Sequence, residues 1–154
     1  MALAAHVFPF VTSEIGLKNI SFTGDTLQVA LIAQASTAYV FDNTDKSLSD
    51  FMANSAGGGA LTEQSTGASN YSRQNLTSVT FTTSGLVNML SCAGPSWASS
   101  SIAATYAVFY DTTYTISASP ALICYWDFGG IQSTSTATFT LSINASGLVT
   151  WTSS

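Results

Sequence analysis

Apolar and polar residues alternate along several segments of the chain, with the two-residue period of a half-buried β-strand. Residues 27–31 place leucine or valine at every second position, and residues 79–82 alternate valine and phenylalanine with threonine. Residues 138–143 alternate phenylalanine, leucine and isoleucine with threonine and serine. Residues 144–147, Asn-Ala-Ser-Gly, supply turn chemistry before a last strand. We therefore predict a β-hairpin over residues 137–152.

Two longer segments, residues 102–110 and 121–128, are apolar on both alternating faces. Strands of this kind lie in the middle of a sheet, with one face on the core of a sandwich. We expect the other face to be covered by a loop or by another subunit. Asp111 and Asp127 stand at the ends of these strands, where a carboxylate can accept hydrogen bonds from turn amides.

Residues 42–70 interrupt the strand pattern. Three apolar residues within 48–52 fall at the i, i+3, i+4 spacing of a short helical face. Ser47 and Asp50 have the spacing of a weak capping box at its start. The triple glycine 57–59 ends the pattern, and a polar loop follows. We predict one long excursion between strands that contains a single short helix.

The N-terminal residues do not follow the alternating pattern of the strands. Residues 1–13 are apolar without period-two alternation, and Pro9 cannot donate to a strand ladder. We predict an N-terminal arm over 1–13, a first strand over 17–22, and one β-sandwich domain over 14–154. Exposed apolar side chains are costly in water. We therefore expect the arm to dock on a neighbouring subunit or another protein through Val7, Phe8, Phe10 and Val11. The alternative is that the arm folds back as an edge strand of its own domain.

The composition narrows the classes of function. Of the 154 residues, 46% are hydrophobic and 7% are charged, against about 25% charged in a typical domain. The net charge is −5, and only Lys18, Lys46 and Arg73 are positive. Three scattered cations exclude nucleic acid and an anionic membrane surface as partners. A surface of serine and threonine suits a packed assembly better than a free enzyme.

Cys92 and Cys124 are the two cysteines. The N-terminal stretch lacks a positive region, and Pro9 interrupts its apolar run, so it does not have the pattern of a secretory signal. Without an oxidising compartment we expect two free thiols, with Cys124 acting as a small core residue.

Candidate catalytic and metal-binding residues are few. His6 is the only histidine, and no nucleophile elbow is present, so a Ser-His-Asp triad is not expected. The cluster Asp42, Asp45 and Asp50 could attract calcium, but it lacks the spacing of an EF-hand loop. A solvated acidic loop is the simpler interpretation.

Paired carboxylates could also support a glycosidase. Asp111, Asp127, Glu63 and Glu14 are available, but an aspartate at a strand end is ordinary turn chemistry. We expect no catalytic residue, no cofactor and no bound metal. A hydrolase remains an alternative, and it requires a cleft with paired carboxylates of perturbed pKa.

Aromatic residues are frequent in the second half of the chain. They could line a sugar-binding face, but tyrosine and tryptophan are more often found in cores and subunit interfaces. We expect core and interface roles for Tyr106, Phe109, Tyr110, Tyr114, Tyr125, Trp126, Phe128 and Trp151.

Four segments carry a resemblance to a known family: NYSRQNL (70–76), PSWASSSIAATYAVFYD (95–111), SPALICYWDFGG (119–130) and GLVTW (147–151). Together they resemble a group of small virion structural proteins of tailed bacteriophages, over roughly residues 15–151. The shared pattern is a Tyr-x-Arg, a tryptophan before a strand that ends in Tyr-Asp, a strand with Asp-Phe-Gly, and a last hairpin. The resemblance implies a virion component with a β-sandwich fold.

The size, acidity and β-rich pattern favour, within that family, a capsid decoration (cement) protein of jelly-roll type. We therefore predict an all-β protein with an antiparallel β-sandwich fold. Its expected partner is the major capsid protein, and we expect a homo-oligomer, with a trimer favoured. The expected location is the virion, which is assembled in the host cytoplasm. Tyr71 and Arg73 of the Tyr-x-Arg motif join the expected interface. The alternative is a tail or baseplate accessory domain that binds host glycans.

Overall fold

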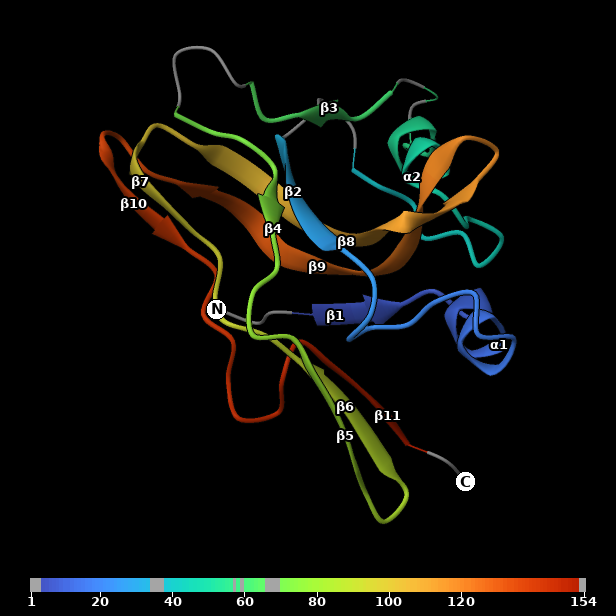
Figure 1. Ribbon diagram of the computed structural model, residues 1–154. Coiled ribbons are helices and arrows are strands. Elements are labelled where there is room, and N and C mark those ends of the chain that lie inside the picture. Colours follow the sequence, from blue (N-terminus) through green and yellow to red (C-terminus); the bar gives the residue numbers. More distant parts are fainter. Residues whose placement is uncertain (1–3, 34–37, 57, 59, 66–69, 153–154) are drawn as a thin grey trace.

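The computed structural model describes residues 4–33, 38–56, 58, 60–65 and 70–152. The described chain is mostly β-strand with two short helices, which confirms the predicted all-β, antiparallel class (Figure 1). The elements follow in this order: β1 (Ala4–Val7), α1 (Phe10–Gly16), β2 (Leu27–Ala33), α2 (Leu48–Ala53), β3 (Thr62–Glu63), β4 (Gln74–Asn75), β5 (Thr80–Ser84), β6 (Val87–Ser91), β7 (Ser96–Ser100), β8 (Ala103–Ile116), β9 (Ser119–Ser133), β10 (Ala137–Thr140) and β11 (Val149–Thr152).

The largest sheet has the strand order β1-β9-β8-β2-β3, and β4 also pairs with β2. All of these pairs are antiparallel. The two long central strands, β8 and β9, contain the segments that are apolar on both faces, as predicted. Residues 106–111 and 121–126 are buried without interruption. A strand covered on both faces has no need of alternating polar residues, which explains the pattern.

Two small sheets cover one face of this large sheet. One has the order β11-β6-β5, and the other pairs β10 with β7. Trp126 of β9 donates its indole N–H to the Leu148 carbonyl at 3.1 Å, just before β11. Phe128 of β9 contacts Phe139 of β10, with ring centroids 6.4 Å apart. The sandwich is therefore one large sheet against two small ones, and its strand order does not establish the jelly-roll topology.

The hairpin predicted over residues 137–152 is wrong. Its two strands lie in different sheets, because β10 pairs with β7 and β11 pairs with β6. The turn sequence makes only an isolated bridge between Asn144 and Gly147. Gly147 has a φ of +75°, and a Cβ there would lie 2.6 Å from the Leu90 carbonyl oxygen. Glycine at this position therefore permits both the turn and the close approach of the backbone to β6.

Helix α2 covers the opposite face of the large sheet, where Phe51 lies 5.5 Å from Tyr125 of β9, centroid to centroid. The predicted short helix and its capping box are confirmed. The Asp50 amide donates to Ser47 Oγ, and the Ser47 amide donates to Asp50 Oδ2. Part of the predicted excursion, namely residues 57, 59 and 66–69, lies outside the described residues. The helices in the described ranges, α1 and α2, are not long and apolar enough to cross a membrane.

The prediction of a separate arm over residues 1–13 is wrong for its described part, which begins at residue 4. Strand β1 pairs antiparallel with β9, and the Phe8 amide donates to the Ile123 carbonyl at 3.3 Å. Phe8 and Val11 are fully buried in the core of their own chain. Residues 10–16 form helix α1, and turns occupy the predicted first strand at 17–22. The edge of β9 is available within the same chain, so the apolar side chains of the N-terminus are buried by pairing with that edge.

Candidate functional site: an uncharged half of the molecule

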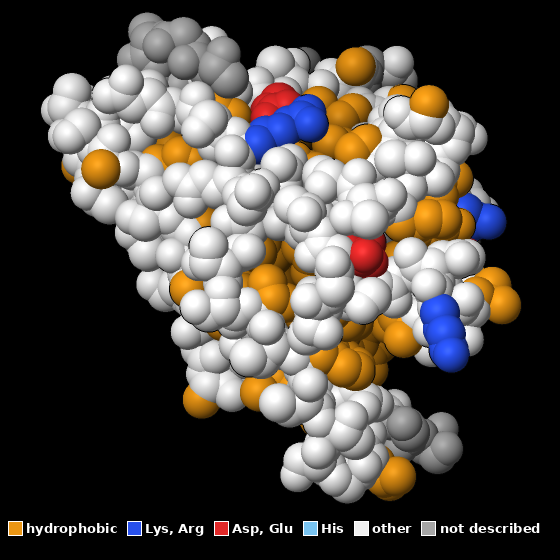
Figure 2. All heavy atoms as spheres, viewed as in Figure 1, with side chains coloured by type: hydrophobic (Ala, Val, Ile, Leu, Met, Phe, Trp, Pro, Cys, Tyr) orange, Lys and Arg blue, Asp and Glu red, His pale blue; other side chains and the backbone are white. Residues whose placement is uncertain are grey.

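Charged residues are confined to one part of the chain. Residues 74–110 and 128–154 contain no aspartate, glutamate, lysine or arginine. These ranges include every strand of the two small sheets: β5, β6, β7, β10 and β11. Figure 2 shows charged side chains over the upper and right parts of one face and none over the β5–β6 hairpin below or the β7–β10 pair at the left. We call the two small sheets the uncharged half.

The β5–β6 hairpin projects from the body of the molecule (Figure 1). A two-residue turn joins its strands, since Ser84 pairs with Val87. Gly85 has a φ of +60°, which suits the first position of such a turn. All five residues of β5 are exposed, and Leu86 at the tip exposes 64% of its surface. The hairpin is therefore apolar at its tip and in contact with water along one edge.

An apolar groove lies between the α1 region and this hairpin. Two adjoining hollows of about 320 Å³ and 380 Å³ share Ile15 and Phe81 in their walls. Phe81 lies 5.2 Å from Phe22 and 6.0 Å from Trp151, centroid to centroid. In the described part of the chain, the buried indole N–H of Trp151 has no hydrogen-bond partner. Because that N–H is itself buried, the groove offers mainly apolar contact to a protein or other ligand, with Lys18 in one wall.

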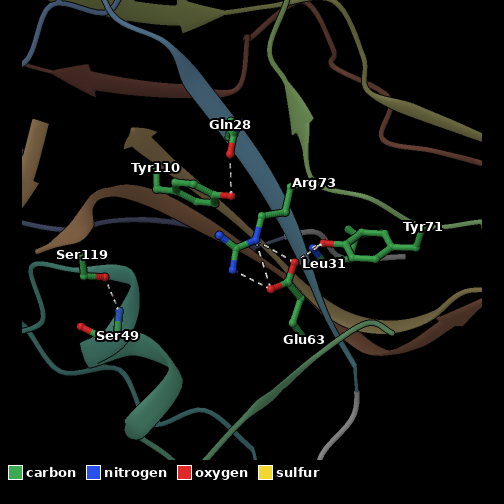
Figure 3. A network of polar contacts seen from close by, with 8 residues as sticks. All are labelled: Gln28, Leu31, Ser49, Glu63, Tyr71, Arg73, Tyr110 and Ser119. Carbon is green, nitrogen blue, oxygen red and sulfur yellow. Dashed lines mark hydrogen bonds and ion pairs between the residues drawn. The ribbon is translucent and has the colours of Figure 1, made fainter. Parts of the chain in front are cut away.

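Tyr71 and Arg73, two of the predicted interface residues, belong to a polar network on the large sheet (Figure 3). Tyr71 accepts a hydrogen bond from the Leu31 amide and donates one to Glu63 Oε1, both at 2.9 Å. Arg73 forms two parallel bonds to the Glu63 carboxylate, and its guanidinium lies 5.6 Å from the centre of the Tyr110 ring. The network connects β3 and the segment before β4 to β2 and β8.

This network assigns the two residues a role within their own chain. Tyr71 is buried, whereas the Arg73 side chain is 43% exposed. The hydrogen bond to the Glu63 carboxylate raises the pKa of Arg73 still further, so the guanidinium stays ionised. Such a fixed bidentate pair positions β3 and the segment that precedes β4.

The other predicted interface residues lie elsewhere. Val7 ends β1 at one edge of the large sheet, Phe8 follows it, and Phe10 and Val11 lie in α1. Tyr71 precedes β4 near the opposite edge of that sheet. The structure therefore does not bring the six residues into one surface. The prediction that Phe8 and Val11 dock on another subunit is wrong, because both are fully buried within their own chain.

The acidic cluster considered for calcium is engaged in local hydrogen bonds. Asp45 is buried and accepts a hydrogen bond from the Tyr39 hydroxyl at 2.8 Å. Asp42 accepts from the Thr44 amide, and Asp50 caps α2. Within the described residues, no group of three or more histidine, cysteine or acidic side chains is arranged to hold a metal.

Asp111 and Asp127 do not form a carboxylate pair. Asp127 is the cross-strand partner of Tyr106, which places it five residues from Asp111 along β8. That spacing corresponds to roughly 16 Å, beyond the separation of about 5–9.5 Å that glycosidases use. Each aspartate instead binds turn amides, as predicted: Asp111 accepts from Thr113 at 2.7 Å and Asp127 from Gly129 at 2.8 Å.

His6 and the cysteines have ordinary surroundings. The His6 ring is half-buried and stacks on Tyr125, with centroids 4.7 Å apart. Cys124 is fully buried and Cys92 is half-buried, and both are free thiols in the structure. Burial raises the pKa of Cys92 to about 11, which makes it a poor nucleophile at neutral pH.

The aromatic residues of the second half are mainly core, as predicted. Six of the eight are buried, and Tyr114 and Trp151 are half-buried. Only Trp151 lines the apolar groove. Sequence reasoning missed the groove and the exposed Phe81 and Leu86, although the absence of charge over 74–110 and 128–154 was a usable signal.

Comparison of the chain with models of protein families, with curated proteins and with solved structures finds no match.

Proposed function

We propose that this protein is a structural component of a tailed-bacteriophage virion, and that it acts as a capsid decoration protein on the outer surface of the major capsid shell. The observation that supports this most strongly is the uncharged half. The cores of protein interfaces are depleted in charged residues, because each buried charge must lose its hydration. A surface made of two whole sheets without a charge can be covered by another protein at little desolvation cost.

The distribution of the remaining charges fits the same role. The eight acidic and three basic residues lie on the large sheet, the helices and the adjoining loops. With the uncharged half on the shell, the net charge of −5 would face solvent and keep decorated particles apart. In this proposal the major capsid protein is the partner, the virion is the location, and assembly in the host cytoplasm precedes release.

The segments that resemble the phage family support the proposal because they build the sandwich of this chain. The shared Trp97 is buried and donates its indole N–H to the Ser72 carbonyl at 2.7 Å, next to the shared Tyr-x-Arg. The other shared segments supply β8 and β9. The resemblance thus concerns residues that build the sandwich, while the uncharged half supplies the binding surface.

A tail or baseplate domain that binds host glycans is the second candidate. It is favoured by the groove beside Phe81 and Trp151, because an exposed aromatic ring such as Phe81 can stack on the apolar face of a sugar. Binding on a glycan array, abolished by Trp151→Ala in a folded protein, would support this candidate over decoration.

Co-sedimentation with shells assembled from the major capsid protein tests the proposal. We expect saturable binding by the wild type. Thr138→Lys places a charge on exposed β10 of the uncharged half, and Thr62→Lys places the same charge on exposed β3 of the large sheet. The first variant should weaken shell binding by at least about ten-fold, in line with an unpaired charge in an interface, and the second should bind like the wild type. Absence of wild-type binding, or loss only in Thr62→Lys, would contradict the proposal.

A further inference from the structure

Strand β5 is an unprotected sheet edge. It pairs with β6 on one side, and no other strand of the described residues pairs with its second side. Proteins usually protect such edges with lysine, proline, a bulge or a covering loop. The sequence of β5 is Thr-Phe-Thr-Thr-Ser, its register with β6 is regular, and all five residues are exposed. An edge without any of these protections is suited to pairing with another strand.

The hairpin geometry identifies the groups on the free edge. In a hairpin with a two-residue turn, the pair next to the turn exchanges both backbone hydrogen bonds, and every second pair along the ladder does the same. Here those pairs are Ser84–Val87, Thr82–Met89 and Thr80–Ser91. The backbone N–H and C=O groups of Phe81 and Thr83 therefore point away from β6.

We propose that β5 pairs with β5 of a second copy of this chain, antiparallel and about a two-fold axis at Thr82. In that register Phe81 of one copy faces Thr83 of the other, and their outward groups form four N–H···O bonds across the axis. The contact is isologous, so the same residues are used on both sides.

Charge is the reason to choose a second copy over another protein. Two copies with a net charge of −5 repel one another through most of their surfaces. Residues 74–110, which contain the whole hairpin, carry no charge, so this edge can meet its own copy without like charges in contact.

The apolar groove supplies a second reason. Antiparallel pairing brings the tip of each hairpin to the base of the other. The tip carries Leu86 and Val87, which expose 64% and 40% of their surfaces. The base of the hairpin adjoins the groove walled by Phe22 and Phe81. Two-fold pairing thus directs an exposed apolar tip toward an exposed apolar groove.

The pairing does not depend on a virion role, and it predicts an even number of copies. If three copies associate through a different surface, as the sequence led us to expect, the β5 contact would join two such trimers.

Thr82 permits a strict test, because it lies on the proposed axis and is exposed. Thr82→Lys and Thr82→Glu each place two like charges opposite one another, and sedimentation velocity should show the mass of each variant halved relative to the wild type. An equimolar mixture should recover the wild-type mass, since lysine then faces glutamate. We expect at least a ten-fold weaker self-association for each variant alone than for the mixture.

Thr150→Lys is the matched control. Thr150 and Thr82 are both cross-strand partners of Met89, so they share one face of the same small sheet but lie on its opposite edges. This control should retain the wild-type mass. Thr83→Pro is a second variant, which removes an outward N–H while leaving the β6 ladder intact, and it should dissociate the pair. A monomeric wild type, an unchanged mass in Thr82→Lys, or a mixture that fails to reassociate would overturn the pairing.

Discussion

Asp111 is an ionisable side chain that is fully buried, so its charged form is disfavoured by the loss of hydration. It is fully buried at the end of the two-sided part of β8, one oxygen binds the Thr113 and Tyr114 amides, and the other has no hydrogen-bond partner in the described residues. Burial, and then the neighbouring Asp25, raises the pKa of Asp111 from an ordinary 3.8 to about 6. The folded protein therefore binds a proton at Asp111 that the unfolded chain releases between these two values.

The consequence for stability follows from this direction. Because the folded-state pKa is the higher one, the contribution of Asp111 is most favourable below about pH 3.8 and is lost as the pH rises through about 6. We expect Asp111→Asn to stabilise the protein at pH 7, since the amide keeps an acceptor for the two turn amides and offers a donor toward Asp25. A shift of about two pKa units corresponds to on the order of 2–3 kcal/mol, or roughly 4–10 °C in melting temperature.

Thermal unfolding between pH 4 and pH 7 measures this effect. The advantage of Asp111→Asn over the wild type should be largest at pH 7 and should shrink toward pH 4. Asp42→Asn is the control, and its expected change in stability has the opposite sign, because hydrogen bonds from Thr44 lower the pKa of Asp42. That variant should lose stability at pH 7 relative to the wild type. An Asp111→Asn protein that is less stable than the wild type at pH 7 would refute the assignment.

Single residues could be interpreted well from sequence where the interaction is local. The capping pair Ser47 and Asp50 was predicted from a three-residue spacing, and so were the turn-binding roles of Asp111 and Asp127. The contact between Asp25 and Asp111 was missed, because it joins residues far apart in the sequence. In the sequence, Asp25 is a single aspartate in a turn, and nothing beside it indicates a contact with Asp111.

At the scale of elements, β1 is the strand whose role differs most from expectation. It is an edge strand of the large sheet, and the chain that follows it places Phe8 among Phe51, Phe41 and Tyr125. Phe8 is fully buried, whereas Phe41 in the same cluster is 43% exposed. The N-terminal strand therefore belongs to the core of the domain.

Two alanine variants test this assignment of β1. Phe8→Ala should lower the free energy of unfolding by about 3–5 kcal/mol, as for other buried phenylalanines. Phe41→Ala should cost about 1 kcal/mol or less, because its ring already contacts water. Urea unfolding of the full chain measures both. Equal and small losses would mean that residues 4–11 do not pack in the core.

The elements also show why some sequence predictions failed. The apolar run over 102–110 favoured a two-sided strand, and that prediction is confirmed by β8. Strand partners are set by long-range packing, so the nearby segments 137–140 and 149–152 were wrongly joined into a hairpin. The N-terminus lacks alternation because β1 has only four residues before α1 begins.

At the scale of the whole molecule, charge is separated from the two small sheets. No charged residue lies in β5, β6, β7, β10 or β11, while the ion pair of Arg73 and Glu63 and the acidic loop of Asp42, Asp45 and Asp50 lie with the large sheet and α2. Composition alone led us to predict an assembly protein. The surface that we propose for binding could be located only from the fold, which places the uncharged strands β5, β6, β7, β10 and β11 in the two small sheets.

An electron cryomicroscopy map of the intact virion would test the proposed role and binding surface most directly. We predict that β5, β6, β7, β10 and β11 face neighbouring subunits, and that Arg73 and the Asp42–Asp50 loop face solvent. Absence of the chain from purified particles would contradict the virion role. A map in which the large sheet and α2 meet the shell and the two small sheets face water would contradict the proposed binding surface.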